Sequence, residues 1–184
     1  MKLVKFRQYA KSFLSGTDGN VTIEFVMVMP FLFWAFMASY VFFDGFRQST
    51  LNVKAAYTIS DLISRETQPI NDDYVDSMVE LMEAMTRSRS QVRMRISVIR
   101  WDEEDNRYYV DWSATRGLGT ERTDETISHI RDQLPSMPDD ERVILVETAN
   151  KFIPLYNIGM DDKNLKNIVF TRPRFAPQVV WSDS

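Results

Sequence analysis

The sequence has no cysteine and a single histidine among its 184 residues. Without cysteine the chain has no disulfide framework, no thiol nucleophile and no cysteine-ligated zinc or iron–sulfur site. One histidine also excludes a metal site built from several histidines of this chain. The sequence therefore predicts no metal site and no cofactor.

The sequence also lacks an excess of positive charge. It has 22 Lys and Arg against 26 Asp and Glu, and its formal net charge is −4 at pH 7. A general nucleic-acid binder needs a basic surface to replace the counterions of phosphate, so nucleic acid is not an expected partner. The length suits one modest domain, or one domain with an appendage.

One long apolar run, residues 25–43, has no charged residue. As a helix rising about 1.5 Å per residue, its 19 residues cover roughly 29 Å, close to the thickness of the hydrocarbon core of a bilayer. A helix in the core of a soluble protein normally has a polar stripe, and this run has none. The run therefore predicts a membrane-spanning helix.

The residues on either side of this run predict its orientation. The side chains of Lys2, Lys5, Arg7 and Lys11 precede it, whereas the basic residues just after it are balanced by acids. Basic residues stay on the cytoplasmic side of a membrane. We therefore expect a single-pass membrane protein with its N-terminus in the cytoplasm and the residues after the span on the other side of the membrane.

A cleaved secretory signal peptide is an alternative interpretation of the apolar run. Such a peptide has a short apolar region followed by a cleavage site between small residues. This run is long, and Phe42, Phe43 and Asp44 at its end do not form such a site. The span is therefore expected to stay in the mature protein.

Two residues in this region break local rules. Glu24 places a carboxylate at the cytoplasmic edge of the apolar run, where burial of charge costs energy. Pro30 lies inside the run and removes one backbone hydrogen bond, which membrane helices tolerate better than soluble ones. On spacing alone, the favoured explanation of these two features is an interfacial carboxylate and a harmless kink.

The residues around Glu24 resemble the processing site of type IV prepilins. That site has a basic leader, a glycine, four further residues, and then a glutamate and an aromatic residue that open a long apolar helix. Here these positions are occupied by Gly19-Asn20-Val21-Thr22-Ile23-Glu24-Phe25. With Pro30 six residues after Glu24, residues 15–60 are similar to TadE/TadG-type proteins of tight-adherence (Tad, or Flp) pilus systems.

This resemblance implies an inner-membrane protein with a periplasmic C-terminal head, and it also implies processing by a peptidase and a set of partners. A prepilin peptidase is expected to cut between Gly19 and Asn20, so that Glu24 becomes the fifth residue of the mature chain. The new amine at Asn20 would need a counter-charge in the membrane, which Glu24 of a neighbouring subunit could supply. Glu24, Phe25 and Pro30 are the expected assembly residues, and the expected partners are other Tad/Flp pilus proteins and minor pilins.

Beyond the span, the pattern predicts a long helical spine with an α+β head. The helix is expected to run over residues 21–65, with one apolar face formed by Leu51, Ala55, Ile59 and Leu62. The expected parts are a basic leader (1–19), the transmembrane helix with its periplasmic extension (20–66) and the periplasmic head (67–184).

The head is expected to be a small antiparallel sheet packed on the spine. A helix capped by Asn71 or Asp72 comes first, with an apolar face from Val75 to Met85. Further elements are expected in this order: a hairpin over 91–115 with a polar turn at 102–106, a helix over 124–134, a strand over 141–154, and short edge strands at 168–175 and 179–181.

We predict a minor pilin-like protein that acts in Tad/Flp pilus assembly and has no small-molecule substrate. An uncleaved single-pass assembly factor is an alternative, and a membrane-anchored periplasmic enzyme is another. His129 has no plausible serine partner, and no Gly-rich phosphate loop or nucleophile elbow is present. The acidic hairpin turn at 102–106 does not follow the ligand spacing of a known calcium loop.

Overall fold

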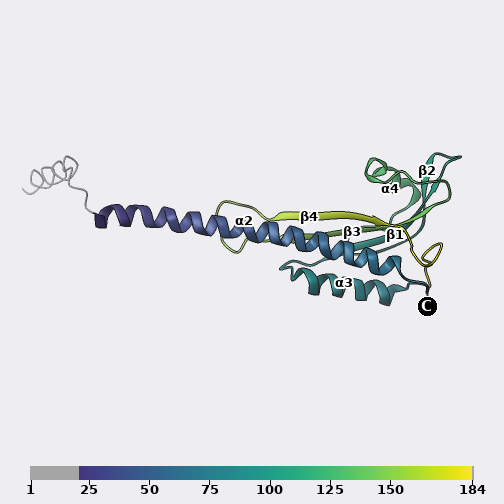
Figure 1. The fold of residues 1–184 in the computed structure, drawn as a ribbon, viewed down its shortest axis with the longest axis horizontal. Coiled ribbons are helices and arrows are strands. Elements are labelled where there is room, and N and C mark those ends of the chain that lie inside the picture. The colour runs from purple at the N-terminus through teal and green to yellow at the C-terminus, as the bar shows by residue number, and fades with distance from the viewer. Residues whose placement is uncertain (1–20, 184) are drawn as a thin grey trace, which may run out of the picture.

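A computed structural model describes residues 21–183 as one long helix that carries a small α+β head (Figure 1). Four antiparallel strands form a single sheet in the order β2-β1-β3-β4. This confirms the predicted long N-terminal helix and antiparallel sheet. The elements are α2 (Val21–Ser64), α3 (Asp72–Thr86), β1 (Arg93–Asp102), β2 (Arg107–Arg116), α4 (Asp124–Ser128), η1 (Arg131–Gln133), β3 (Arg142–Phe152) and β4 (Lys163–Thr171).

The helix α2 has 44 residues without interruption, which corresponds to roughly 66 Å. Its N-terminal half projects from the head, and its C-terminal half lies along the sheet beside α3 (Figure 1). The buried side chains of the second half repeat at alternating spacings of three and one, which is one face of a helix. They are Asn52, Ala55, Ala56, Ile59, Ser60, Ile63 and Ser64.

This buried face differs from the predicted one at two positions. Leu62 is 37% exposed and Leu51 is only partly buried, whereas Ile63 is fully buried. The face is rotated toward small residues such as Ala56 and Ser60, because small side chains let the helix backbone approach the sheet closely. Ser60 uses this approach to donate its hydroxyl to Thr171 Oγ1 in β4 at 2.9 Å.

A matched pair of substitutions tests this orientation of α2. Ile59→Ala is expected to lower the free energy of unfolding by about 2–4 kcal/mol, because it leaves a cavity in the core. Leu62→Ala should cost less than about 1 kcal/mol, since its side chain is partly in solvent. Urea unfolding of the detergent-solubilised full chain measures both. Equal losses would contradict the observed orientation.

The first core cluster lies between the two helices and one face of the sheet. Of the two predicted caps, Asn71 is the one that caps α3, by accepting a hydrogen bond from the backbone N–H of Tyr74. Val75 and Met82 of α3 pack with Met94, Ile96 and Val98 of β1. The helices therefore cover one face of the sheet along most of its length.

The opposite face of the sheet is covered by α4 and the segment that follows it, and this region differs from the predicted single helix. A second cluster joins Ile99, Val143 and Leu145 of the sheet to Ile127 of α4 and to Met137. The expected helix over 124–134 is wrong in length: α4 ends at Ser128 and a 3₁₀ turn follows at Arg131–Gln133. Because both faces are covered, β1 and β3 are buried on both sides.

The C-terminal strands also differ from the prediction. One strand, β4, runs from Lys163 to Thr171, so it begins and ends earlier than the expected 168–175. Its first five residues include two lysines and two asparagines and are mostly exposed, which is typical of a solvated edge strand, and Pro173 follows its end. The expected strand at 179–181 is an isolated bridge in which Trp181 pairs with Ile70.

Candidate membrane-anchoring site

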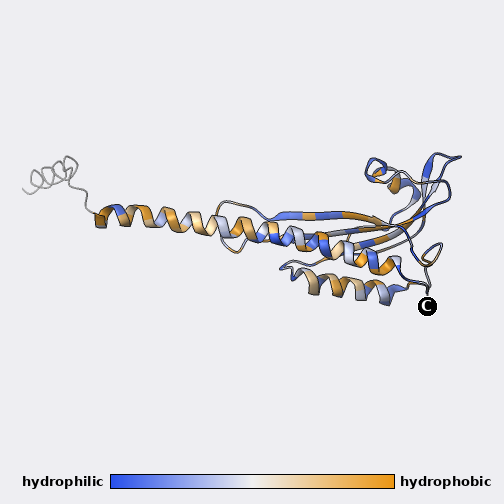
Figure 2. Cartoon of the chain, in the orientation of Figure 1, coloured by the Kyte–Doolittle hydropathy of each residue, from blue (hydrophilic) through white to orange (hydrophobic). Residues whose placement is uncertain are grey.

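The N-terminal half of α2 presents apolar side chains to its surroundings on all sides. Phe25 is 57% exposed, Trp34 is 52% exposed and Phe43 is 76% exposed. In the most apolar window of 18 residues, only 6% of the residues are buried, whereas the core helix of a soluble protein is mostly buried. Figure 2 shows this half as a nearly continuous apolar rod. The helix is long and apolar enough to span a membrane.

The three predicted assembly residues within the described part of the chain all lie near the start of α2 and are all exposed. Glu24 stands in the first turn, where the positive end of the helix dipole favours a carboxylate. Pro30 is six residues further on, so it lies about 240° around the helix axis from Glu24. The structure therefore does not bring them to one face. Gly19 and Asn20 lie outside the described residues.

The helix continues through Pro30 without a break. Proline has no N–H to donate, so the carbonyl of Val26 loses its usual partner one turn earlier. In lipid such a carbonyl is tolerated where a neighbouring helix or side chain can compensate. The exposed position of Pro30 leaves that side of α2 open to another helix.

The head makes its first contacts with α2 at the end of the apolar run. The ring of Tyr156, in the β3–β4 connection, packs edge-on against Tyr40 with 5.9 Å between ring centroids. One turn later, Asp44 lies 4.0 Å from Arg89. Gln48 then donates to the backbone carbonyl of Thr86 at the end of α3, at 3.1 Å. The head thus packs against α2 from Tyr40 onward.

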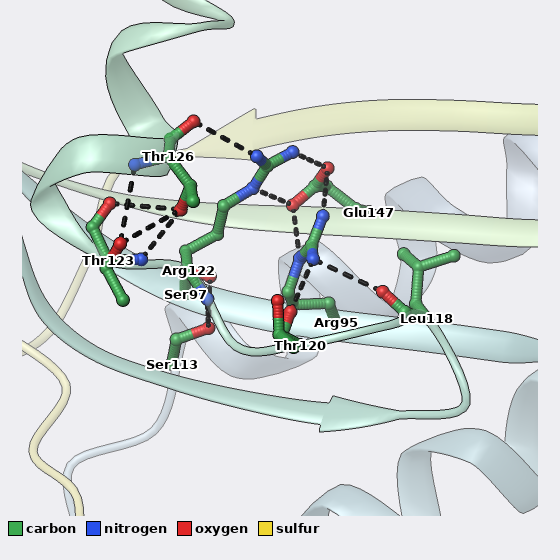
Figure 3. Close-up of polar contacts among 9 residues, drawn as sticks. All are labelled: Arg95, Ser97, Ser113, Leu118, Thr120, Arg122, Thr123, Thr126 and Glu147. Carbon is green, nitrogen blue, oxygen red and sulfur yellow. Dashed lines mark hydrogen bonds and ion pairs between the residues drawn. The ribbon is translucent and has the colours of Figure 1, made fainter.

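A buried group of three charges lies on the other face of the sheet (Figure 3). Arg95 of β1 donates from Nε to Glu147 of β3 at 2.7 Å, and from Nη2 at 2.9 Å. Arg122 donates to the same carboxylate at 2.9 and 2.6 Å. Their side chains are 8–13% exposed. We call Arg95, Glu147 and Arg122 the charge triad.

The remaining donors of the charge triad bind backbone. Nη1 of Arg95 donates to the carbonyls of Leu118 and Thr120, at 3.2 and 2.7 Å. Nη1 of Arg122 donates to the carbonyl of Thr126 in α4 at 3.2 Å. Each guanidinium nitrogen of the two arginines therefore donates at least one hydrogen bond, and the triad ties the segment between β2 and α4 to the sheet.

The triad also sets the ionisation of Glu147. Burial alone raises the pKa of this carboxyl, but the hydrogen bonds and charges of Arg122 and Arg95 together outweigh burial, and the net pKa is below its ordinary value of 4.5. The carboxylate is consequently held ionised, as a structural ion-pair partner for the two arginines. This arrangement is typical of a structural ion-pair network that fixes a loop, because the two arginines also donate to backbone carbonyls of that loop and of α4.

Sequence reasoning did not find the charge triad. The available signal was a charge inside each of two apolar strands, Arg95 in β1 and Glu147 in β3, which lie directly opposite each other in the sheet register. Opposite charges that face each other across strands stabilise a sheet. The third member, Arg122, lies in a connection, and its position could not be read from strand patterns.

The polar residues that the sequence analysis considered for a metal site or for catalysis do not form such a site among the described residues. At the hairpin tip, Asp102 accepts from the backbone N–H of Asp105 at 3.0 Å, so it closes the turn. His129 is exposed. Among residues 21–183, no group of three or more His, Cys, Asp and Glu side chains could hold a metal ion.

Comparison with known proteins adds nothing to these contacts. No family model, no curated protein and no solved structure matches the chain. A functional interpretation therefore depends on two features of the structure. The N-terminal half of α2 is an exposed apolar rod, and the head packs against α2 from the end of that rod onward.

Proposed function

We propose that this protein is a single-pass inner-membrane protein that acts as a minor pilin-like component in the assembly of a Tad/Flp type IV pilus. The observation that carries the proposal is that the two halves of α2 have different surroundings. Its first half is apolar and exposed, and its second half forms part of the core of the head. One helix thereby serves both as a membrane anchor and as the spine of an exported domain.

The proposed topology follows from the charges that flank the span. Lys2, Lys5, Arg7 and Lys11 favour a cytoplasmic N-terminus, which places the head in the periplasm. The role is structural and not enzymatic. The partners are the lipid bilayer, other Tad/Flp pilus proteins and minor pilins, and a prepilin peptidase as the processing enzyme.

Glu24 is the residue to which we assign subunit docking. Its carboxylate is exposed at the start of the apolar rod, where an unpaired charge is costly near hydrocarbon. Cleavage after Gly19 would create an amine on Asn20 of each subunit. Pairing of this amine with Glu24 of a neighbour would neutralise both charges in a setting of low dielectric constant, which favours assembly.

Glu24→Gln is expected to leave membrane insertion intact while impairing pilus assembly. Loss of a charge-assisted contact worth about 1.5–3 kcal/mol should weaken docking by roughly 10- to 100-fold. The measurement compares sheared pilus fractions with membrane fractions by immunoblot. Glu104→Gln, which makes the same change at an exposed position in the turn between β1 and β2, is the matched control and should support normal pili. Normal piliation by Glu24→Gln would show that Glu24 has no docking role.

An uncleaved assembly factor with the same fold is the second candidate. The exposed apolar rod supports it equally well, because anchoring does not require processing. The intact mass of the membrane-fraction protein, measured in cells that contain the peptidase, separates the two. A mature chain that begins at Asn20 supports a pilin-like subunit, and a chain that still begins at Met1 supports the uncleaved factor.

A further inference from the structure

Four cationic side chains gather where the head meets the apolar rod. Arg47 comes from α2, Arg87 and Arg89 from the connection between α3 and β1, and Lys151 from the end of β3. All four are exposed and line one hollow. We call these four residues the basic cluster. Three segments that are distant in the sequence thus contribute positive charge to one place.

The basic cluster has little negative charge to balance it. Among the described residues that line the hollow, Asp44 is the only acid, and it lies 4.0 Å from Arg89. Arg89 also donates to the carbonyl of Ile153 at 3.1 Å, which fixes its position. Glu80 and Glu83 of α3 line a different hollow. The hollow therefore has an excess of positive charge that attracts an anion.

Arg87 occupies a position where glycine or asparagine is usual. It ends α3 in the left-handed conformation, with φ at 47° and ψ at 40°, a conformation that costs energy for a residue with a long side chain. The chain nevertheless places a guanidinium there, next to the other three cations.

The basic cluster stands at the height of the lipid headgroups if α2 spans a bilayer. Phe43 is the last residue of the apolar run, and Arg47 follows about 6 Å further along the helix. The headgroup layer on each side of the hydrocarbon core is roughly 5–8 Å thick. Arg47 and its neighbours therefore lie at the level of the phosphates.

The β3–β4 connection, residues 153–162, reaches further along α2 toward its N-terminus than the connection between α3 and β1 does (Figure 1). Its Tyr156 contacts Tyr40, which lies about 6 Å before Asp44 along α2. Leu155 is 50% exposed and Ile153 is 36% exposed. Apolar and tyrosine side chains at this level are typical of the membrane interface.

We propose that the basic cluster binds the phosphate groups of anionic phospholipids in the periplasmic leaflet, with the β3–β4 connection inserted beside α2 in the same leaflet. This proposal rests on the membrane span proposed above. Asp161 and Asp162 of the connection line a separate hollow with Tyr156. The head is thereby held against the membrane surface.

The test uses the full chain in nanodiscs made of phosphatidylcholine alone or with phosphatidylglycerol. Hydrogen exchange of the backbone over 86–91 and 151–157 should slow by about tenfold when phosphatidylglycerol is present. The test variant combines Arg47→Gln, Arg87→Gln and Lys151→Gln, and it should lose this effect. The control variant combines Arg65→Gln, Arg172→Gln and Arg174→Gln, which remove the same charge at exposed sites on other parts of the head, and it should keep the effect.

Each outcome decides the proposal. Exchange that does not depend on phosphatidylglycerol, or a test variant that keeps the dependence, would overturn lipid binding. Equal slowing by inorganic phosphate in phosphatidylcholine nanodiscs would also overturn it, in favour of a soluble anion. Failure of the chain to insert into either nanodisc would instead refute the membrane span itself, so the two failures are distinguishable.

Discussion

Glu147→Gln is expected to lower the free energy of unfolding by about 3–5 kcal/mol. The substitution preserves the size of the side chain but removes the charge that balances Arg95 and Arg122. These arginines are 11% and 13% exposed, so neither can recover its hydration without opening the structure. Urea unfolding of the detergent-solubilised full chain at neutral pH measures the loss.

Asp61→Asn is the matched control for this substitution. Asp61 also lies between two arginines, at 2.8 Å from Arg65 and 3.0 Å from Arg174. All three side chains are 36–54% exposed, so water screens their charges, and the expected loss is at most about 1 kcal/mol. A similar loss of unfolding free energy for both variants would show that burial of the charge triad does not increase its contribution to stability.

The effect of Glu147→Gln should also depend on pH. The pKa of Glu147 is lower in the folded chain than in the unfolded chain. Its contribution to stability is therefore fully present above its ordinary pKa of 4.5 and is lost as the pH falls through the lower folded value. The wild type should approach the variant in stability on acidification. A difference that stays constant down to low pH would contradict this assignment.

Deletion of residues 1–39 is expected to move the protein from the membrane to the soluble fraction. Each large apolar residue near the centre of a span favours the bilayer by about 0.3–0.6 kcal/mol, so loss of the rod removes several kcal/mol of anchoring energy. The deletion spares Tyr40, where the contacts of the head begin. Fractionation after an alkaline carbonate wash measures the change, because the wash releases proteins held only by surface charge.

A leucine–alanine segment in place of residues 25–39 is the matched control for this deletion. It restores length and apolarity without the native side chains, and it should return the chain to the membrane pellet. A shortened chain that still resists the wash would show that another part of the protein is inserted in lipid. The apolar rod would then not be the anchor.

Sequence patterns predicted the features that neighbouring residues define. The charge-free run at 25–43 and the cap at Asn71 belong to this class, and so does the hairpin turn at 102–106. In each case a local signal is enough, since a helix start, a tight turn or an apolar length is defined by neighbouring residues.

The patterns failed where contacts between distant segments decide the structure. The buried face of α2 is rotated toward Ala56 and Ser60 because the sheet selects small side chains, although Leu62 is more apolar. The charge triad joins three segments, and the basic cluster joins α2 to the ends of α3 and β3. No local periodicity shows that such charges will meet.

Because α2 continues without a loop from the apolar rod into the head, a change in the direction of the rod also changes the direction of the head. Ser64 lies about 32 Å beyond Phe43 on the same helix, so a change of tilt of about 10° in the bilayer would swing the far end of the head by roughly 5–6 Å. In the proposed membrane-spanning arrangement, a change of bilayer thickness that alters this tilt would thereby move the far end of the head relative to its proposed partners.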